Sequence, residues 1–231
     1  MALVVGLDGD DTLWHNERLF SMTESRFRSL VEPFADGHDV SSSLLETERR
    51  NLRLFGYGVK SFALSMIETA IEVSDGQVPT SVIAELVDAG KQMLTHPVEL
   101  FDGARETVAA LSERWRLILI TKGDLFHQES KLARSGLLPH LDRVEIVSEK
   151  EPSTYRRILD AARVDPADFV MVGDSMRSDI EAALDVGARA IHIPGYREWA
   201  LEQSGLTGPE DGRWWRLRSF RELPGLLSTL G

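Results

Sequence analysis

Five short apolar runs without polar alternation are the feature that most constrains the fold of this chain. They are residues 3–7, 117–120, 144–147, 169–172 and 190–193. Strands buried on both faces of a parallel sheet give continuous apolar runs, whereas strands with one solvent face alternate. Helical patterns follow around 103–114, 124–135, 153–163 and 177–186. The alternation of strands and helices predicts a doubly wound α/β layer with a parallel sheet.

The segment after the first run has a different pattern. Residues 15–97 contain no convincing strand, and helical patterns near 17–31, 43–54, 61–73 and 80–94 are separated by glycine and proline. We therefore expect an α/β core domain made of residues 1–14 and 98–231. A helical domain of residues 15–97 is then inserted after the first strand.

Charge and composition narrow the classes of partner and of chemistry that this protein can have. The formal net charge is −11 and the pI is about 5.0, which disfavours nucleic acid or an anionic membrane as the main partner. The chain has no cysteine, so disulfides, thiolate nucleophiles and cysteine-bound metals are excluded. The apolar run at the N-terminus is far shorter than a membrane span of about 20 residues, and it has no basic flank or cleavage site. We expect a cytoplasmic protein.

Three acids stand directly after the first strand run. The sequence there is Asp8-Gly9-Asp10-Asp11-Thr12. Ligands of parallel sheets bind beyond the carboxyl ends of the strands, and clustered carboxylates repel one another unless a cation or substrate compensates. A ligand site and an ordinary acidic surface turn are both open readings of this cluster alone.

The next two runs end in residues suited to phosphate. Thr121-Lys122-Gly123 offers a hydroxyl and backbone N–H groups at a strand-to-helix turn, although Thr121 alone could simply cap the helix. Lys150 follows the third run and can neutralise phosphate charge or restrain a carboxylate. Lys131 is an alternative for the same role.

The fourth run ends in Gly173-Asp174, with Asp179 five residues further on. The glycine permits close backbone approach. Carboxylate oxygens together with water and a phosphate oxygen suit Mg²⁺. Both aspartates could instead be helix N-terminal acids that satisfy the dipole, and this alternative is most plausible for Asp179.

These residues occur in order at the ends of successive strands, and the ordered set resembles the haloacid dehalogenase superfamily, in its phosphatase branch. The resemblance implies a Rossmann-like core with a helical cap inserted after the first motif. It also implies that Asp8 is the nucleophile and that Asp10 is the general acid and base. Dehalogenases of the superfamily resemble this pattern but lack the second aspartate, so Asp10 favours phosphate chemistry.

By the same resemblance, Mg²⁺ is held by an Asp8 oxygen, the Asp10 backbone carbonyl and Asp174. Thr121 and Lys150 stabilise the phosphoryl group. Thr12 fixes the loop and the Asp10 rotamer, and Asp179 orients metal-bound water or Lys150. By this resemblance, Thr12 and Asp179 orient other groups of the site and do not themselves react with the substrate.

The substrate implied is a small phosphorylated metabolite, handled by a monomer or homodimer. Residues expected to contact it are His15, Asn16, Lys60, Lys122 and Gly123. Two other functions remain open at this point. One is a phosphotransferase or phosphomutase that uses the same aspartyl phosphate, and the other is a non-catalytic phosphate-binding module.

The adjacent Trp214-Trp215 is conspicuous near the C-terminus. The pair could cover a sheet edge or belong to a dimer contact, and ordinary packing is the simpler expectation.

Overall fold

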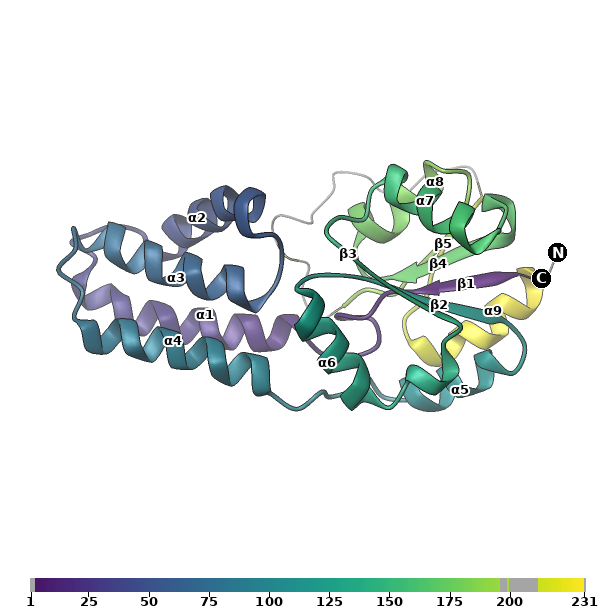
Figure 1. Cartoon of the computed structure of the whole chain (residues 1–231), viewed down its shortest axis with the longest axis horizontal. Coiled ribbons are helices and arrows are strands. Elements are labelled where there is room, and N and C mark those ends of the chain that lie inside the picture. Colours follow the sequence, from purple (N-terminus) through teal and green to yellow (C-terminus); the bar gives the residue numbers. More distant parts are fainter. Residues whose placement is uncertain (1–2, 196–198, 200–211, 231) are drawn as a thin grey trace. The chain divides into compact units, whose positions relative to one another are not determined.

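The computed structural model describes residues 3–195, 199 and 212–230 (Figure 1). The chain divides into two compact units, one of Met1–Glu17 with Val98–Gly231 and the other of Arg18–Pro97. The second unit therefore begins at residue 18, whereas the sequence placed the start of the insertion at residue 15. The reason is local bonding: the His15 N–H donates to the Glu99 carbonyl at 2.9 Å, and the backbone N–H groups of Asn16 and Glu17 donate to Asp11.

The first unit contains a six-stranded, wholly parallel sheet in the order β3-β2-β1-β4-β5-β6. Its strands are β1 (Val4–Leu7), β2 (Arg116–Lys122), β3 (Arg143–Val147), β4 (Phe169–Gly173), β5 (Arg189–His192) and β6 (Trp214–Arg216). Strand β1 lies between β2 and β4, with Gly6 in register with Ile118 and Met171. The sequence prediction of a doubly wound α/β fold is confirmed.

Helices cover both faces of this sheet (Figure 1). They are α5 (Ala104–Ser112), α6 (Leu125–Ser135), α7 (Pro152–Ala162), α8 (Ala182–Leu184) and α9 (Leu223–Leu230), and a π-helix (Met176–Glu181) precedes α8. Apolar residues of α5, α6 and α9 share one core cluster with β1 residues Val5 and Leu7. Residues of α7 and α8 share a second cluster with Val4. Alternate side chains of β1 thus enter opposite layers, as the two-residue period of a strand requires.

Two strands differ from the sequence expectation. Strand β3 is an edge strand whose first four residues are only partly buried, so it is not covered on both faces as its apolar run indicated. The conspicuous Trp214 and Trp215 form the opposite edge strand, β6, paired with Ala190 and Ile191 of β5. A three-residue strand leaves too short a pattern to be predicted from sequence periodicity.

The second unit consists of helices, as the missing strand signals predicted. They are α1 (Glu17–Val31), α2 (Val40–Phe55), α3 (Val59–Val73) and α4 (Thr80–Thr95), and α1 begins at the last residue of the first unit. Phe27, Leu44, Met66 and Leu86 contribute one buried residue from each helix to a shared core.

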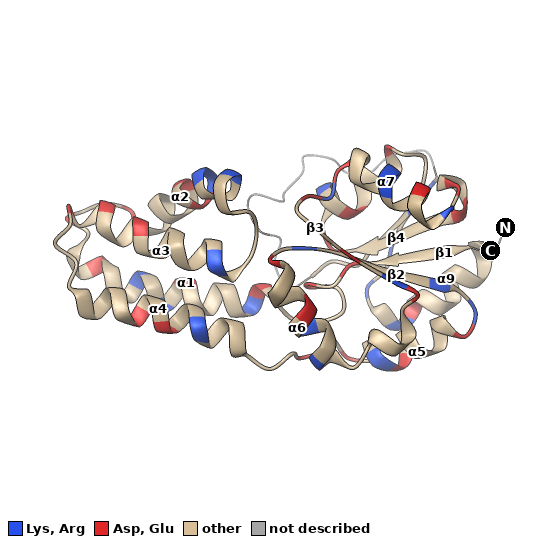
Figure 2. Cartoon of the chain, in the orientation of Figure 1, with Lys and Arg blue, Asp and Glu red and all other residues tan. Residues whose placement is uncertain are grey.

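Acidic and basic residues are interspersed along helices of both units (Figure 2). Of the helices in the described part of the chain, none combines the length and the apolar composition that a membrane span requires.

Candidate active site

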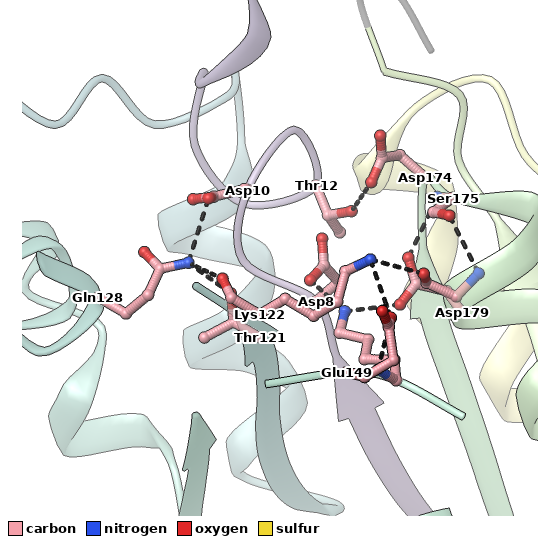
Figure 3. Close-up of polar contacts among 12 residues, drawn as sticks. Asp8, Asp10, Thr12, Thr121, Lys122, Gln128, Glu149, Asp174, Ser175 and Asp179 are labelled. Carbon is pink, nitrogen blue, oxygen red and sulfur yellow. Dashed lines mark hydrogen bonds and ion pairs between the residues drawn. The ribbon is translucent and has the colours of Figure 1, made fainter. Parts of the chain in front are cut away.

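The predicted site residues of the sheet unit gather where the strands end (Figure 3). Asp8 directly follows β1, and its N–H donates to the Val172 carbonyl of β4 at 2.9 Å. Thr121 and Lys122 are the last residues of β2, Lys150 lies beyond β3, and Asp174 follows β4. The carboxyl ends of neighbouring parallel strands meet at one edge, and this topology explains why residues so distant in sequence come together.

The loop after Asp8 is a tight turn. The Gly9 carbonyl accepts hydrogen bonds from the N–H groups of Leu13 and Trp14, at 2.8 and 3.2 Å. A Cβ on Gly9 would lie 2.6 Å from the Trp14 ring, so glycine is required there for space. Asp11 has a positive φ of 58°, which allows the chain to turn back within this loop.

Lys150 joins two buried carboxylates. Its ammonium donates to Asp8 Oδ1 and, at 2.7 Å, to Asp179 Oδ1. Burial lowers the pKa of Lys150, but the charges of Asp179 and Asp8 outweigh it and hold that pKa well above its ordinary value. Lys150 is therefore a fixed positive charge against the predicted nucleophile.

The single positive charge of Lys150 does not neutralise the three carboxylates around it. Asp8, Asp174 and Asp179 each bring a carboxylate oxygen within 4.8 Å of the others. Burial raises the pKa of Asp8 to about 7 against the effect of Lys150. Burial, together with the charges of Asp8 and Asp179, raises the pKa of Asp174 well above its ordinary value. The ionised forms of Asp8 and Asp174 are therefore disfavoured here, and a further cation would favour them.

The three acids differ in how many of their oxygens are already bonded. Asp179 accepts from Lys150 with Oδ1 and from the Ser175 N–H with Oδ2, at 3.1 Å. Asp174 accepts from the Thr12 hydroxyl at 3.5 Å through Oδ1. This oxygen-only set, with Asp8 and Asp179 buried and Asp174 partly buried, fits Mg²⁺. Asp8 and Asp174 are better able to offer oxygens than Asp179. The Thr12 hydroxyl lies at Asp174, whereas the sequence analysis expected it to orient Asp10.

The π-helix positions Asp179. Ser175 begins it and accepts from the Ser178 N–H at 3.0 Å, and the Tyr155 hydroxyl donates to the Ser178 carbonyl at 2.9 Å. A Cβ on Gly173 would overlap the Asp179 carboxyl group. Asp179 can approach Lys150 because residue 173 carries no side chain.

Asp10 is held apart from the three clustered acids (Figure 3). Its carboxylate accepts from Trp14 Nε1 at 2.5 Å, Lys131 Nζ at 2.6 Å and Gln128 Nε2 at 3.1 Å. Burial raises the pKa of Asp10, but the charge and hydrogen bond of Lys131 outweigh it and lower that pKa below its ordinary value. Lys150 and Lys131, the two alternatives of the sequence analysis, thus contact different aspartates.

The remaining predicted residues have the following positions. The Thr121 hydroxyl is buried and accepts from Gln128 Nε2 at 2.9 Å. Lys122 Nζ donates to Ser178 Oγ at 2.8 Å, and Gly123 has a φ of 133° in the turn before α6. Asn16 Oδ1 accepts from Lys131 at 3.1 Å.

His15 and Lys60 are the other two residues predicted to contact substrate. The His15 ring packs on Phe101 with a centroid distance of 3.9 Å. Lys60 is an exposed residue at the start of α3, in the other compact unit, so its predicted contact with substrate stays a prediction.

Sequence reasoning missed Gln128 and Tyr155. Both are buried helix residues, on α6 and α7, and both have ordinary helical context in the sequence. The available signal was spacing: Gln128 lies four residues after Asp124, the N-cap of α6, and so one turn into the helix that follows Thr121.

The chain matches the family described as haloacid dehalogenase-like hydrolase over residues 3–187. It is 31% identical over 137 residues to N-acylneuraminate-9-phosphatase of Mus musculus, covering 57% of this chain and 53% of that protein. It is 33% identical over 95 residues to glyceraldehyde 3-phosphate phosphatase of Pyrococcus furiosus, covering 38% of this chain and 40% of that protein. The matches thus span about half the length of these curated relatives or less.

Solved structures extend the likeness over the whole chain. A haloacid dehalogenase-like family hydrolase from Xanthomonas campestris is 40% identical, with a TM-score of 0.87, over 99% of this chain and 91% of that chain. A 2-haloacid dehalogenase from Pseudomonas syringae pv. tomato is 20% identical, with a TM-score of 0.66 over 100% of both chains, and so shares the fold. With the family match over most of its length, this chain is a hydrolase that belongs to the haloacid dehalogenase-like family.

Proposed function

We propose that this protein is a Mg²⁺-dependent phosphohydrolase that cleaves a phosphate monoester of a small metabolite through an aspartyl-phosphate intermediate. The observation that carries the proposal is the division of labour among the aspartates. Asp8 is paired with Lys150 beside Asp174, while Asp10 is held separately by neutral and cationic donors. A nucleophile beside a cation site and a second carboxylate outside it suit phosphoryl transfer with acid–base assistance.

In the first step, one Asp8 carboxylate oxygen forms a bond to phosphorus while the bond from phosphorus to the ester oxygen breaks. Lys150 holds the Asp8 carboxylate in place through Oδ1. The Thr121 hydroxyl accepts from Gln128, so its own hydrogen is available to a phosphoryl oxygen. Positioning and charge stabilisation provide most of the catalysis in such transfers.

Asp10 handles the protons. It donates a proton to the leaving oxygen, so that the substrate departs as an alcohol, and a phosphate dianion bound nearby raises its pKa for that purpose. In the second step water attacks phosphorus, Asp10 takes the proton of that water, and Asp8 is released together with inorganic phosphate. The ionised state that Lys131 favours in the free site suits this second role.

An Asp8 oxygen, the Asp10 backbone carbonyl and Asp174 would hold Mg²⁺. When bound, the ion neutralises phosphoryl oxygens and stabilises the charge of the transferring group. Asp179 holds Lys150 and Thr12 holds Asp174, which gives both a positioning role.

The chain's relatives favour a phosphate ester over a haloacid as substrate. The curated matches are named as phosphatases, and Asp10 provides the acid that an alcohol leaving group needs and a halide does not. We further propose that His15, Asn16, Lys60, Lys122 and Gly123 contact the substrate beyond its phosphate.

The test is phosphate release from an aryl phosphate by the wild type and Asp8→Asn, each with Mg²⁺ and with EDTA. The proposal expects release from the wild type with Mg²⁺ and only the buffer rate in the other three samples. Equal activity of wild type and Asp8→Asn would contradict it. Adding an alcohol acceptor distinguishes a phosphotransferase, because the phosphoryl group then appears on that acceptor.

A further inference from the structure

Three donors from two parts of the sheet unit converge on the Asp10 carboxylate. Trp14, in the same loop, contributes its indole N–H, and helix α6 contributes Gln128 and Lys131. All three side chains belong to buried residues. We call Trp14, Gln128 and Lys131 the Asp10 donor set.

The donors are divided unequally between the two carboxylate oxygens. Oδ1 accepts from Trp14 at 2.5 Å and from Lys131 at 2.6 Å. Among the described residues, Oδ2 accepts only the longer 3.1 Å bond from Gln128. An oxygen that already accepts an ammonium and an indole N–H has little capacity left for a proton. Oδ2 is therefore the oxygen suited to exchange a proton with substrate or water.

The Gln128 amide also connects Asp10 with Thr121, the residue proposed to bind the phosphoryl group. Its Nε2 lies 3.1 Å from Asp10 Oδ2, 2.9 Å from Thr121 Oγ1 and 2.6 Å from the Lys122 carbonyl (Figure 3). One amide group thereby relates the position of the acid to that of the hydroxyl proposed to bind the phosphoryl group.

Lys131 contacts both the Asp10 carboxylate and the loop that carries it. Its ammonium also donates to Asn16 Oδ1 at 3.1 Å, at the end of the loop that carries Asp10. Its charge is thus directed at Asp10 and at that loop, while Lys150 is directed at Asp8 and Asp179.

We propose that Lys131 and Gln128 are positioning residues that hold Asp10 with Oδ2 toward the leaving group. Lys131 acts on the rate through Asp10, and Gln128 acts through both Asp10 and Thr121. This inference rests on the proposed function, because it assigns a role to residues behind its acid–base group. It predicts that losing Lys131 impairs protonation of the leaving group more than attack on phosphorus, and that losing Gln128 impairs both steps.

The experiment compares kcat/KM for a series of aryl phosphates, from dinitrophenyl phosphate, whose leaving group needs no proton, to phenyl phosphate, whose leaving group does. Lys131→Met should lose roughly 10²-fold on phenyl phosphate and less than about threefold on dinitrophenyl phosphate. Gln128→Met should lose activity on both substrates, and more on phenyl phosphate, because Gln128 also contacts Thr121. Lys131→Arg, which keeps the charge, should recover most of the loss. Arg134→Met is the matched control, since it removes a charge from an exposed position of the same helix and should behave as wild type.

A double variant separates positioning from a general structural effect. If Lys131 acts through Asp10, Asp10→Asn with Lys131→Met should be no slower on phenyl phosphate than Asp10→Asn alone. An equal loss on every aryl phosphate in Lys131→Met, or additive losses in the double variant, would overturn the inference while leaving the proposed function in place. Wild-type rates in Asp8→Asn would instead show that the proposed function itself has failed.

Discussion

Lys150 and its three neighbouring acids define the site at the scale of single residues. Asp8 and Asp179 both bind this ammonium. Asp174 lies beside them, and its pKa is raised by desolvation and by their charges. The net charge of this group is negative when all three acids are ionised. In the proposed function, these residues receive a positive ion and a phosphoryl group together.

Lys150→Met tests the fixed charge without changing a carboxylate. The variant should have a kcat for an aryl phosphate about 10²–10³-fold lower than that of the wild type, because it lacks the fixed positive charge that stabilises the phosphoryl group during transfer. Calorimetric binding of Mg²⁺ should persist, since lysine is not a metal ligand. Lys91→Met, at an exposed position on α4, is the control, and an unchanged kcat in Lys150→Met would contradict the assignment.

Gly173→Ala tests the space that Asp179 occupies. The added Cβ would overlap the Asp179 carboxyl group, so the free energy of unfolding should fall by about 1–3 kcal/mol and Mg²⁺-dependent activity should drop. Urea unfolding and phosphate release measure the two effects. Gly225→Ala has no atom within 4 Å of its Cβ and should be neutral or slightly stabilising. Equal behaviour of the two variants would refute this account of Gly173.

Sequence position was sufficient to predict some of these residues and not others. Asp8 and Asp174 directly follow strands and Lys150 lies three residues after one, so the sequence indicated that these three residues lie at the same edge of the sheet. The choice between Lys150 and Lys131 was left open, because a linear pattern does not say which carboxylate a long side chain reaches.

At the scale of elements, helix α6 connects Asp10 with Thr121, because its side chains contact both residues. Its first turns carry His127, Gln128 and Lys131, and its N-cap is Asp124, which accepts from the His127 N–H at 3.0 Å. Burial, and then the charge of Lys131, lowers the pKa of His127 to about 4. This histidine is therefore neutral in the folded protein over most of the acidic range.

His127 should make folding stability depend on pH in a defined window. The unfolded chain protonates it below about pH 6.5, whereas the folded chain does so only near pH 4. As the pH falls from 6.5 to 4, its contribution to the free energy of unfolding should therefore decrease, by about 1–2 kcal/mol after allowance for solvent screening.

Urea unfolding of the wild type and His127→Gln at pH 7 and pH 5, both in EDTA, measures this effect. The wild type should lose more stability between the two values than the variant, because glutamine carries no titrating group. An identical pH dependence of the two proteins would disprove the role assigned to His127.

Other elements show where sequence patterns stop being informative. The long amphipathic helices were predictable to within a few residues, whereas β6 has three residues and the π-helix has the same apolar spacing as a short α-helix. The register of the π-helix depends on contacts such as that of the Tyr155 hydroxyl with the Ser178 carbonyl, which no local pattern reveals.

At the scale of the whole molecule, a sheet unit built from two separate stretches of chain carries the site residues described above. That discontinuity was predictable because residues 15–97 lack strand signals. The start of the insertion was not, because backbone bonds to Asp11 and Glu99 keep residues 15–17 with the sheet.

Mg²⁺ should stabilise the folded protein as a whole. A ligand that binds only the folded state raises the free energy of unfolding, by about 2.7 kcal/mol at a concentration 100 times its Kd. Differential scanning calorimetry should show a higher Tm with Mg²⁺ than with EDTA. In Asp174→Asn most of that difference should disappear, and a Mg²⁺ shift equal to that of the wild type would argue against Asp174 as a ligand.

The central claim is that Asp8 carries the phosphoryl group during turnover, and the most direct test is to detect it there. Wild-type protein is mixed with an aryl phosphate and Mg²⁺, quenched in acid within one turnover, digested and analysed by mass spectrometry. The account predicts one phosphoryl group on the peptide that contains Asp8, and none in Asp8→Asn or in EDTA. Turnover of the aryl phosphate with no phosphorylated Asp8 peptide at any quench time, or with the group on another residue, would contradict it.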